Sequence, residues 1–216
     1  MIINNSQEIL DKFHLLKHPF YQNWSEGKLS METLKRYAEQ YYHHVDAFPR
    51  YISTIHSKCE DLPSRQILLA NLNDEEAGEE NHPELWLRFA EKLGATREAV
   101  KNVTKLENTN ALIHGYFNLT KTSYAMGLGA LYAYERQVPD VAKSKIDGLR
   151  KFYNLDSEEG LKFFTVHITV DEWHSSEILD LIMMQPTEQK IESFDGAIRG
   201  AKLLWGFLDG IHAACQ

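Results

Sequence analysis

Three side chains in the last third of the chain have the spacing of metal ligands. His167, Asp171 and His174 lie at relative positions zero, four and seven. At about 100° per residue these positions fall within a narrow arc of one helix face, so their polar ends can converge on one ion or on a close pair of ions. The same side chains can also be solvated, or can hydrogen-bond one another. The spacing alone leaves both interpretations open.

A second candidate group comprises Glu75, within an acidic run over residues 74–80, and His82, just after it. Glu75 and His82 are seven residues apart and would share one face of an unbroken helix. Pro83 disfavours the α conformation at His82, so we expect His82 at a bend or at the start of the next helix. Taken by itself, the run of five carboxylates is most simply a solvated surface.

Glu135 ends the apolar segment 128–135. An unpaired carboxylate on a buried face is costly, so we expect a cation, a metal ion or hydrogen-bond donors beside it. Three histidines and three carboxylates from three separate helical regions then form the candidate ligand set: Glu75, His82, Glu135, His167, Asp171 and His174. This set suits two iron or manganese ions better than a structural zinc site, although zinc stays open for a subset. The repeated Glu-x-x-His pair that is usual in di-metal bundles is absent.

The elements that must hold these residues are helices. Apolar residues recur at three- and four-residue spacings, and alternating β-branched runs are nearly absent. We expect Ser30 to cap a long helix that is bent at Pro49. The pattern predicts helices over about 6–16, 20–24, 31–59, 63–78, 84–93, 96–100, 108–127, 131–135, 141–152, 158–184 and 188–212. We therefore predict an all-α, compact helical bundle that forms a single domain over residues 1–216.

Composition excludes several classes of protein. The 216 residues carry a net charge of −8, which argues against a nucleic-acid partner. Two cysteines, Cys59 and Cys215, provide neither a disulfide framework nor a four-cysteine zinc site, and they favour a reducing compartment. The first residues lack a basic region followed by an apolar run, and no apolar stretch is long enough for a membrane helix. We expect a cytoplasmic protein without a membrane partner.

Several segments resemble one known family. They are residues 20–27 (FYQNWSEG), 47–51 (AFPRY), 71–76 (NLNDEE) and 131–135 (LYAYE), together with the His167, Asp171 and His174 triplet. From about His18 to Leu208, the chain resembles the chlamydial protein associating with death domains (CADD) and its relatives. This CADD-like family lies within the TenA/PqqC-like group, which includes pyrroloquinoline-quinone synthase and thiaminase-II and has a heme-oxygenase-like fold. The resemblance implies that all six candidate ligands hold a dinuclear metal centre.

The resemblance also implies an activity. Members of this family are implicated in an oxygen-dependent synthesis of p-aminobenzoate for folate, in which a tyrosine of the protein itself is the ring source. By resemblance that tyrosine is Tyr21, and Lys145 supplies the amino nitrogen. Tyr37 and Tyr134 match family tyrosines near the site that relay electrons or position the ring. Phe163 replaces a further family tyrosine, which puts any radical role at that position in doubt.

The residues alone suggest simpler roles for two of these side chains. Without the family, Tyr21 would be an aromatic core anchor beside Phe20 and Trp24, and Lys145 would be a surface lysine.

The expected partners of the enzyme are molecular oxygen and a reductant, and we expect a homodimer. Two other functions stay open: a di-metal oxygenase that turns over an external small molecule many times, and an interaction protein for a host death domain. A thiaminase-II role is disfavoured because no cysteine lies in the aromatic, carboxylate-rich segments. A cofactorless quinone-forming oxidase is disfavoured because its site would not need three carboxylates and three histidines.

Overall fold

All regular elements in residues 2–215 are helices. The computed structural model describes the backbone of these residues and the side chains of residues 6–168 and 173–215. The elements are α1 (Ile2–Lys12), η1 (Leu15–Lys17), α2 (Pro19–Ser25), α3 (Met31–His56), α4 (Leu62–Glu76), α5 (His82–Lys92), α6 (Arg97–Asn102), α7 (Glu107–Thr122), α8 (Tyr124–Glu135), α9 (Val138–Phe152), α10 (Glu158–Met184) and α11 (Thr187–Ala214). The prediction of an all-α bundle is confirmed. Within the described part of the chain, no helix is both long and apolar enough to span a membrane.

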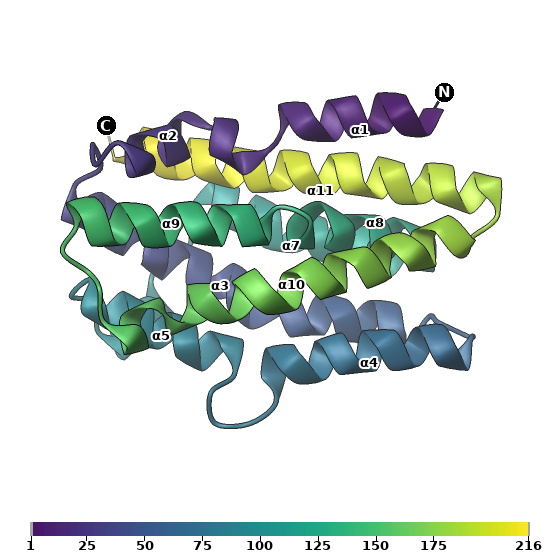
Figure 1. The fold of residues 1–216 in the computed structure, drawn as a ribbon, viewed down its shortest axis with the longest axis horizontal. Helices are drawn as coiled ribbons and strands as arrows, with labels where there is room; N and C mark the ends of the chain where they lie inside the picture. Colours follow the sequence, from purple (N-terminus) through teal and green to yellow (C-terminus); the bar gives the residue numbers. More distant parts are fainter. Residues whose placement is uncertain (1, 216) are drawn as a thin grey trace.

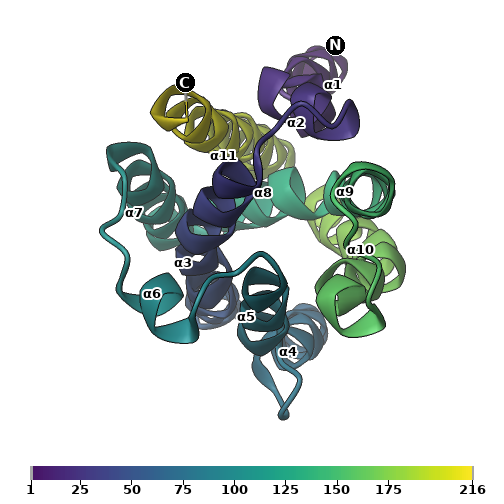
Figure 2. The same ribbon diagram turned by 90° about the vertical axis from the view of Figure 1, so that its left-hand side faces the viewer.

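The long helices lie roughly along one axis of the molecule (Figure 1). Seen along this axis, α3 and α8 lie inside a ring formed by the other helices (Figure 2). Helix α10 packs against α9, α5 and α8, and it also contacts α4. The candidate ligands and Lys145 therefore lie on helices that meet in the interior of the bundle.

Helix α8 is the most deeply buried of these helices, since every residue from Ala125 to Glu135 is buried. It approaches α11 closely because glycines face the partner backbone. A Cβ atom on Gly129 would lie 1.7 Å from the carbonyl oxygen of Ser193, and one on Gly196 would lie 2.3 Å from that of Met126. This close packing holds Glu135, at the end of α8, in the core.

Local signals explain most helix ends. Ser30 caps α3, its side chain accepting a hydrogen bond from the backbone amide of Thr33, and Pro49 lies inside this helix.

The prediction of one helix over 108–127 is wrong. Ser123 is extended, and its hydroxyl caps α8 by accepting from the Met126 amide at 3.0 Å, so α7 ends at Thr122. The first helix also differs from its prediction, since α1 begins at Ile2 and ends at Lys12 before the short η1.

Candidate metal centre and the adjoining cavity

Three ligand-type side chains converge where α4, α5 and α10 meet. Glu75 lies in the last turn of α4, His82 is the first residue of α5, and His167 lies within α10. All three are buried, and each offers a donor atom within 4.8 Å of the other two. Among the side chains described, no other group of three or more His, Cys, Asp or Glu residues comes together in this way.

His82 reaches this position because α5 begins at it. The side chain of Asn81 caps the helix by accepting a hydrogen bond from the Glu84 amide at 3.0 Å. Pro83 occupies the first turn, where no amide donor is required. The prediction of a bend or a helix start at His82 is confirmed.

The two histidines of this cluster differ in their electrostatic environment. Burial lowers the pKa of His82, but Glu75, whose Oε2 lies 2.6 Å from Nδ1 of His82, brings that pKa above its ordinary value. Burial holds the pKa of His167 well below its ordinary value. Nδ1 of His167 donates a hydrogen bond to the carbonyl oxygen of Phe163, which leaves Nε2 with a free lone pair. His167 is thus a neutral imidazole, the form that binds metal ions.

Glu135 is a carboxylate in an apolar environment. Its side chain is buried, and Oε1 accepts a hydrogen bond from Nδ2 of Asn71 at 2.7 Å. Oε2 is also buried and has no hydrogen-bond partner among the described residues. Burial raises the pKa of Glu135 to about 8, and the charge of Glu75 adds to this effect. The Asn71 amide meets the expectation of a cation, a metal ion or hydrogen-bond donors beside this carboxylate, and the unpartnered Oε2 is open to a further partner.

His174 lies on the same face of α10 as His167 but has different neighbours. Its Nε2 lies 3.1 Å from Oδ2 of Asp74, on α4, and its Nδ1 lies 3.9 Å from Oε2 of Glu177. The side chain of Asp171 lies outside the described residues. The structure thus brings Glu75, His82 and His167 together, whereas Glu135 and His174 have separate partners.

A second group joins Tyr21, Tyr37 and Lys145. Tyr21 lies on α2, Tyr37 on α3 and Lys145 on α9. The hydroxyl groups of Tyr21 and Tyr37 are 3.0 Å apart, and Nζ of Lys145 donates to the hydroxyl oxygen of Tyr37 at 2.8 Å. Burial raises the pKa of both phenols well above the ordinary value, so both stay protonated.

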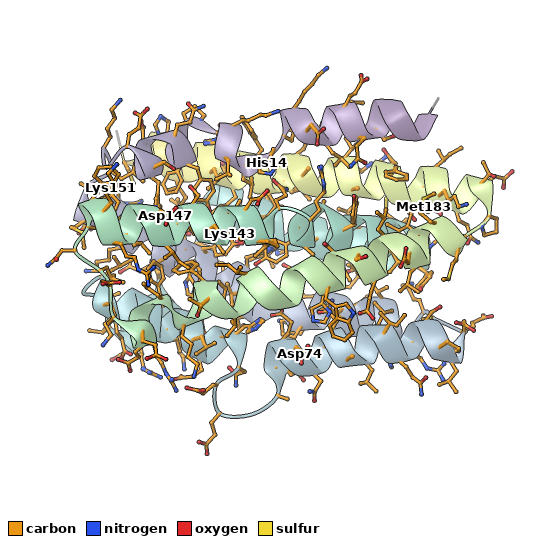
Figure 3. The ribbon with its side chains drawn as sticks, viewed as in Figure 1. His14, Asp74, Lys143, Asp147, Lys151 and Met183 are labelled. Carbon is orange, nitrogen blue, oxygen red and sulfur yellow. The ribbon has the colours of Figure 1, made fainter. Side chains whose placement is uncertain are left out.

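Lys145 faces the interior although its helix borders solvent. Charged side chains at 143, 147 and 151 mark the exposed face of α9 (Figure 3). Nζ of Lys145 instead lies between 5.2 and 5.6 Å from five aromatic ring centroids, those of Tyr21, Tyr37, Tyr41, Trp86 and Phe164. Burial lowers the pKa of Lys145 to about 7, so a large share of the amine is neutral near pH 7.

A cavity of about 20 Å³ connects the two groups. Tyr21, Lys145 and His167 all line it. Tyr134 also borders this space, and its ring packs 4.5 Å from that of Phe48. The reacting side chains expected from the family resemblance therefore adjoin the candidate metal centre directly.

Phe163 lies between the cavity and the cluster. Its ring centroid is 4.2 Å from that of His167 and 5.9 Å from that of His82. A phenyl ring here orients both imidazoles by packing and offers no hydroxyl to the site.

Three polar residues of the site were not selected from the sequence as functional: Asn71, Asp74 and Glu177. Asn71 precedes Glu75 by one helical turn, and Glu177 follows His174 by three residues, so both share a helix face with a candidate ligand. This spacing is a usable signal, but it is common on any helix. Only the contacts described above single these residues out.

The residues present fit a bound metal ion. Two imidazoles and a carboxylate converge in the interior, and mixed nitrogen and oxygen donors of this kind suit iron or manganese. The unpartnered Oε2 of Glu135 is a further donor without another function in the fold.

Comparisons with known proteins agree with this chemistry. A family described as iron-containing redox enzyme matches residues 35–205. A 4-aminobenzoate synthase from Nitrosomonas europaea is 41% identical, and the match covers 94% of this chain and 88% of that protein. A 4-aminobenzoate synthase from Chlamydia pneumoniae is also 41% identical, with 93% of this chain and 92% of that protein covered.

Solved structures share the fold. A TenA homolog from Pseudomonas syringae has a TM-score of 0.82 at 20% identity, with 98% of this chain and 91% of that chain covered. A CADD-like protein of unknown function from Nostoc punctiforme has a TM-score of 0.76 at 16% identity, with 99% and 96% covered. The resemblance to the CADD-like family and to the heme-oxygenase-like fold, inferred from sequence, is confirmed.

Proposed function

The chain belongs to the family of iron-containing redox enzymes, and we propose that it forms 4-aminobenzoate from its own Tyr21, with Lys145 as the donor of the amino nitrogen. The observation that carries this proposal is the hydrogen-bonded group of Tyr21, Tyr37 and Lys145 beside a cavity that His167 also lines. Relatives that are 39 to 41% identical and bear the name 4-aminobenzoate synthase support it.

The atoms of the product match the two side chains. Cleavage of the bond between Cα and Cβ of Tyr21 releases the ring together with Cβ, which becomes the carboxylate carbon after oxidation. A new bond joins Nζ of Lys145 to the ring carbon that carried the phenolic oxygen, and that oxygen leaves as water. The Nζ–Cε bond of Lys145 also breaks oxidatively, with molecular oxygen as the oxidant, so the nitrogen leaves with the ring. Each chain can therefore yield one product molecule at most.

The metal centre of this proposal holds two ions, iron alone or iron with manganese, on Glu75, His82, Glu135, His167, Asp171 and His174. When bound, these ions would supply the oxidising power by reducing molecular oxygen with electrons from an external reductant.

The protein's own side chains hold the phenol in place. Because the Tyr37 oxygen accepts a hydrogen bond from Lys145, the Tyr37 proton is free to be donated to the phenolic oxygen of Tyr21. The same proton is available when that oxygen leaves. Tyr134, which borders the same cavity, is positioned to exchange electrons with the ring.

The size of the cavity favours an internal substrate. About 20 Å³ holds one or two molecules the size of water, and molecular oxygen is of comparable size. A separate aromatic substrate does not fit without movement of the surrounding side chains. The ring of Tyr21 already borders the space, so the reaction on this residue needs only a small molecule to enter.

Product stoichiometry tests the proposal. Purified protein given iron or manganese, a reductant and oxygen is expected to yield no more than one 4-aminobenzoate per chain. Intact-mass and peptide analysis is expected to find the loss confined to residues 21 and 145. An enzyme acting on an external molecule would instead give many equivalents with Tyr21 intact.

The reaction is expected to depend on pH through Lys145. Its pKa is lowered by burial to about 7, so the amine is neutral above that pH and protonated below it. Because a protonated amine cannot form a new bond, the single-turnover rate is expected to fall by about tenfold for each pH unit below 7. Rates measured between pH 6 and 8.5 check this.

A matched pair of variants supports the pH experiment. Lys145→Arg is expected to abolish the product, and Lys143→Arg, on the exposed face of α9, is expected to keep the wild-type yield and pH profile. A wild-type rate that does not change through pH 7 would argue against Lys145 as the donor, as would product from Lys145→Arg.

Three further predictions rest on the sequence. A homodimer is tested by light scattering, a host death-domain partner by a pull-down with a purified death domain, and a cytoplasmic location by fractionation.

A further inference from the structure

Three buried side-chain atoms on α8 and α10, each of a type that binds metal ions, have no hydrogen-bond partner among the described residues. They are Oε2 of Glu135, Nδ1 of His174 and Oε2 of Glu177. Glu135 and His174 are 2% and 3% exposed, and Glu177 is partly buried with its Oε2 shielded from solvent. Buried polar atoms are nearly always paired, so these unpaired atoms indicate that a cation is bound here in the functional protein.

Two of these atoms lie near one another. Nδ1 of His174 is 3.9 Å from Oε2 of Glu177, three residues further along α10. Two donors bound to one ion at about 2.1 Å lie roughly 3 to 4 Å apart. The negative charge of Glu177 also raises the pKa of Glu135, on α8, and a divalent cation bound to either carboxylate would offset this repulsion.

The orientation of the His174 ring also supports a cation at this position. Asp74 lies on α4, where this helix faces α10 (Figure 3), and its Oδ2 is 3.1 Å from Nε2 of His174. A carboxylate at this nitrogen favours the tautomer with a proton on Nε2, which leaves the Nδ1 lone pair directed towards Glu177. Histidines that bind metals commonly donate their other N–H to a carboxylate in this way.

We propose that Glu177 is a ligand of the second metal ion through Oε2, together with Nδ1 of His174, and that Asp74 positions His174. Neither Glu177 nor Asp74 belongs to the six ligands that the family resemblance implies. The inference rests on the two-ion centre of the proposed function. It adds a carboxylate to that ion, which strengthens its preference for a hard cation such as Mn²⁺.

Titration of the metal-free protein with Mn²⁺ tests the assignment. Free Mn²⁺ is followed by its electron paramagnetic resonance signal without oxygen, so the measurement does not depend on product formation. Wild-type protein is expected to bind two ions per chain. Glu177→Gln is expected to weaken one of them at least tenfold and to leave the other unchanged. Asp180→Asn, an exposed carboxylate on the same helix, is the matched control and is expected to bind as wild type.

Thermal unfolding distinguishes a lost ligand from a lost fold. Glu177→Gln removes a repelling charge, so the metal-free variant is expected to unfold at or above the wild-type midpoint temperature. The increase in this midpoint on addition of Mn²⁺ is expected to be smaller than for the wild type. If this variant does not fold, Glu177→Asp, which shortens the side chain by one methylene, is expected to show the same loss of affinity.

Three results would overturn the inference. If Glu177→Gln binds both ions as tightly as the wild type, Glu177 is not a ligand of the centre. If Asp180→Asn loses as much Mn²⁺ affinity as Glu177→Gln, the loss results from the removal of a negative charge in general and not of a ligand. A wild-type protein that binds a single ion refutes this site and the two-ion centre together. If the wild type binds two ions but forms no 4-aminobenzoate, the proposed function fails and the assignment of Glu177 stands.

Discussion

Tyr21→Phe protein is expected to form no detectable 4-aminobenzoate, a loss of at least about 100-fold from the wild-type yield. The substitution removes the phenol whose hydroxyl lies 3.0 Å from that of Tyr37. A phenyl ring is harder to oxidise and carries no oxygen for the amino nitrogen to replace. Quantification of the product after a single exposure to metal, reductant and oxygen measures the effect.

The variant is expected to fold. Phenylalanine fills nearly the same volume, so the main change is one lost buried hydrogen bond, which costs about 1 kcal/mol. For a chain of this size that lowers the unfolding midpoint by roughly 2 to 4 °C. Tyr153→Phe is the matched control, because the Tyr153 hydroxyl accepts only from the Leu29 amide and does not border the cavity. A wild-type yield from Tyr21→Phe would refute the use of this residue as substrate.

Glu135→Gln is expected to change stability in opposite directions in the metal-free and metal-loaded protein. Burial raises the pKa of Glu135 from an ordinary 4.5 to about 8 in the metal-free fold. A carboxyl whose pKa is raised on folding costs nothing below its unfolded pKa, and its cost grows with pH until the folded pKa is reached. The wild-type protein therefore loses stability between about pH 4.5 and 8, and the glutamine variant does not.

The expected difference is on the order of 4 to 5 kcal/mol at pH 8.5 in favour of metal-free Glu135→Gln, and about 1 kcal/mol at pH 5. Glutamine can still accept the hydrogen bond from Asn71 through Oε1, and its uncharged amide nitrogen takes the position of the oxygen that already lacks a partner. With iron or manganese present, the wild type gains stability from binding whereas the variant gains much less. Urea unfolding at both pH values, with and without metal, gives the free energy of unfolding under all four conditions.

Glu188→Gln, at an exposed position in the first turn of α11, is the control for charge removal and is expected to change none of these values. If Glu135→Gln binds metal as wild type does, or is destabilised at pH 8.5 without metal, Glu135 is not the buried ligand that its unpartnered oxygen indicates.

Most of the helices and the residue types of the site could be predicted from the sequence. Ser30 before α3 and the periodicity of α10 are encoded within a few neighbouring residues, and the separation of His167 and His174 already gives them one helix face. The error at Ser123 arose because an apolar pattern continues through a residue whose extended backbone ends one helix and caps the next. The sequence around Lys145 favours burial of this residue, since Lys145 shares a helix face with the apolar residues Val141, Ala142 and Leu149.

Which of these groups come into contact depends on how the helices pack. Residues 75, 82 and 167 come from three helices, and their distances depend on how α4, α5 and α10 pack. The same packing buries Lys145 among aromatic rings, pairs Asp74 with His174 and leaves one oxygen of Glu177 without a partner. Caps and periodicity act through hydrogen bonds and side chains within one or two helical turns, so they can be inferred from sequence. Contacts between helices form between residues far apart in the chain, and only the packed bundle determines them.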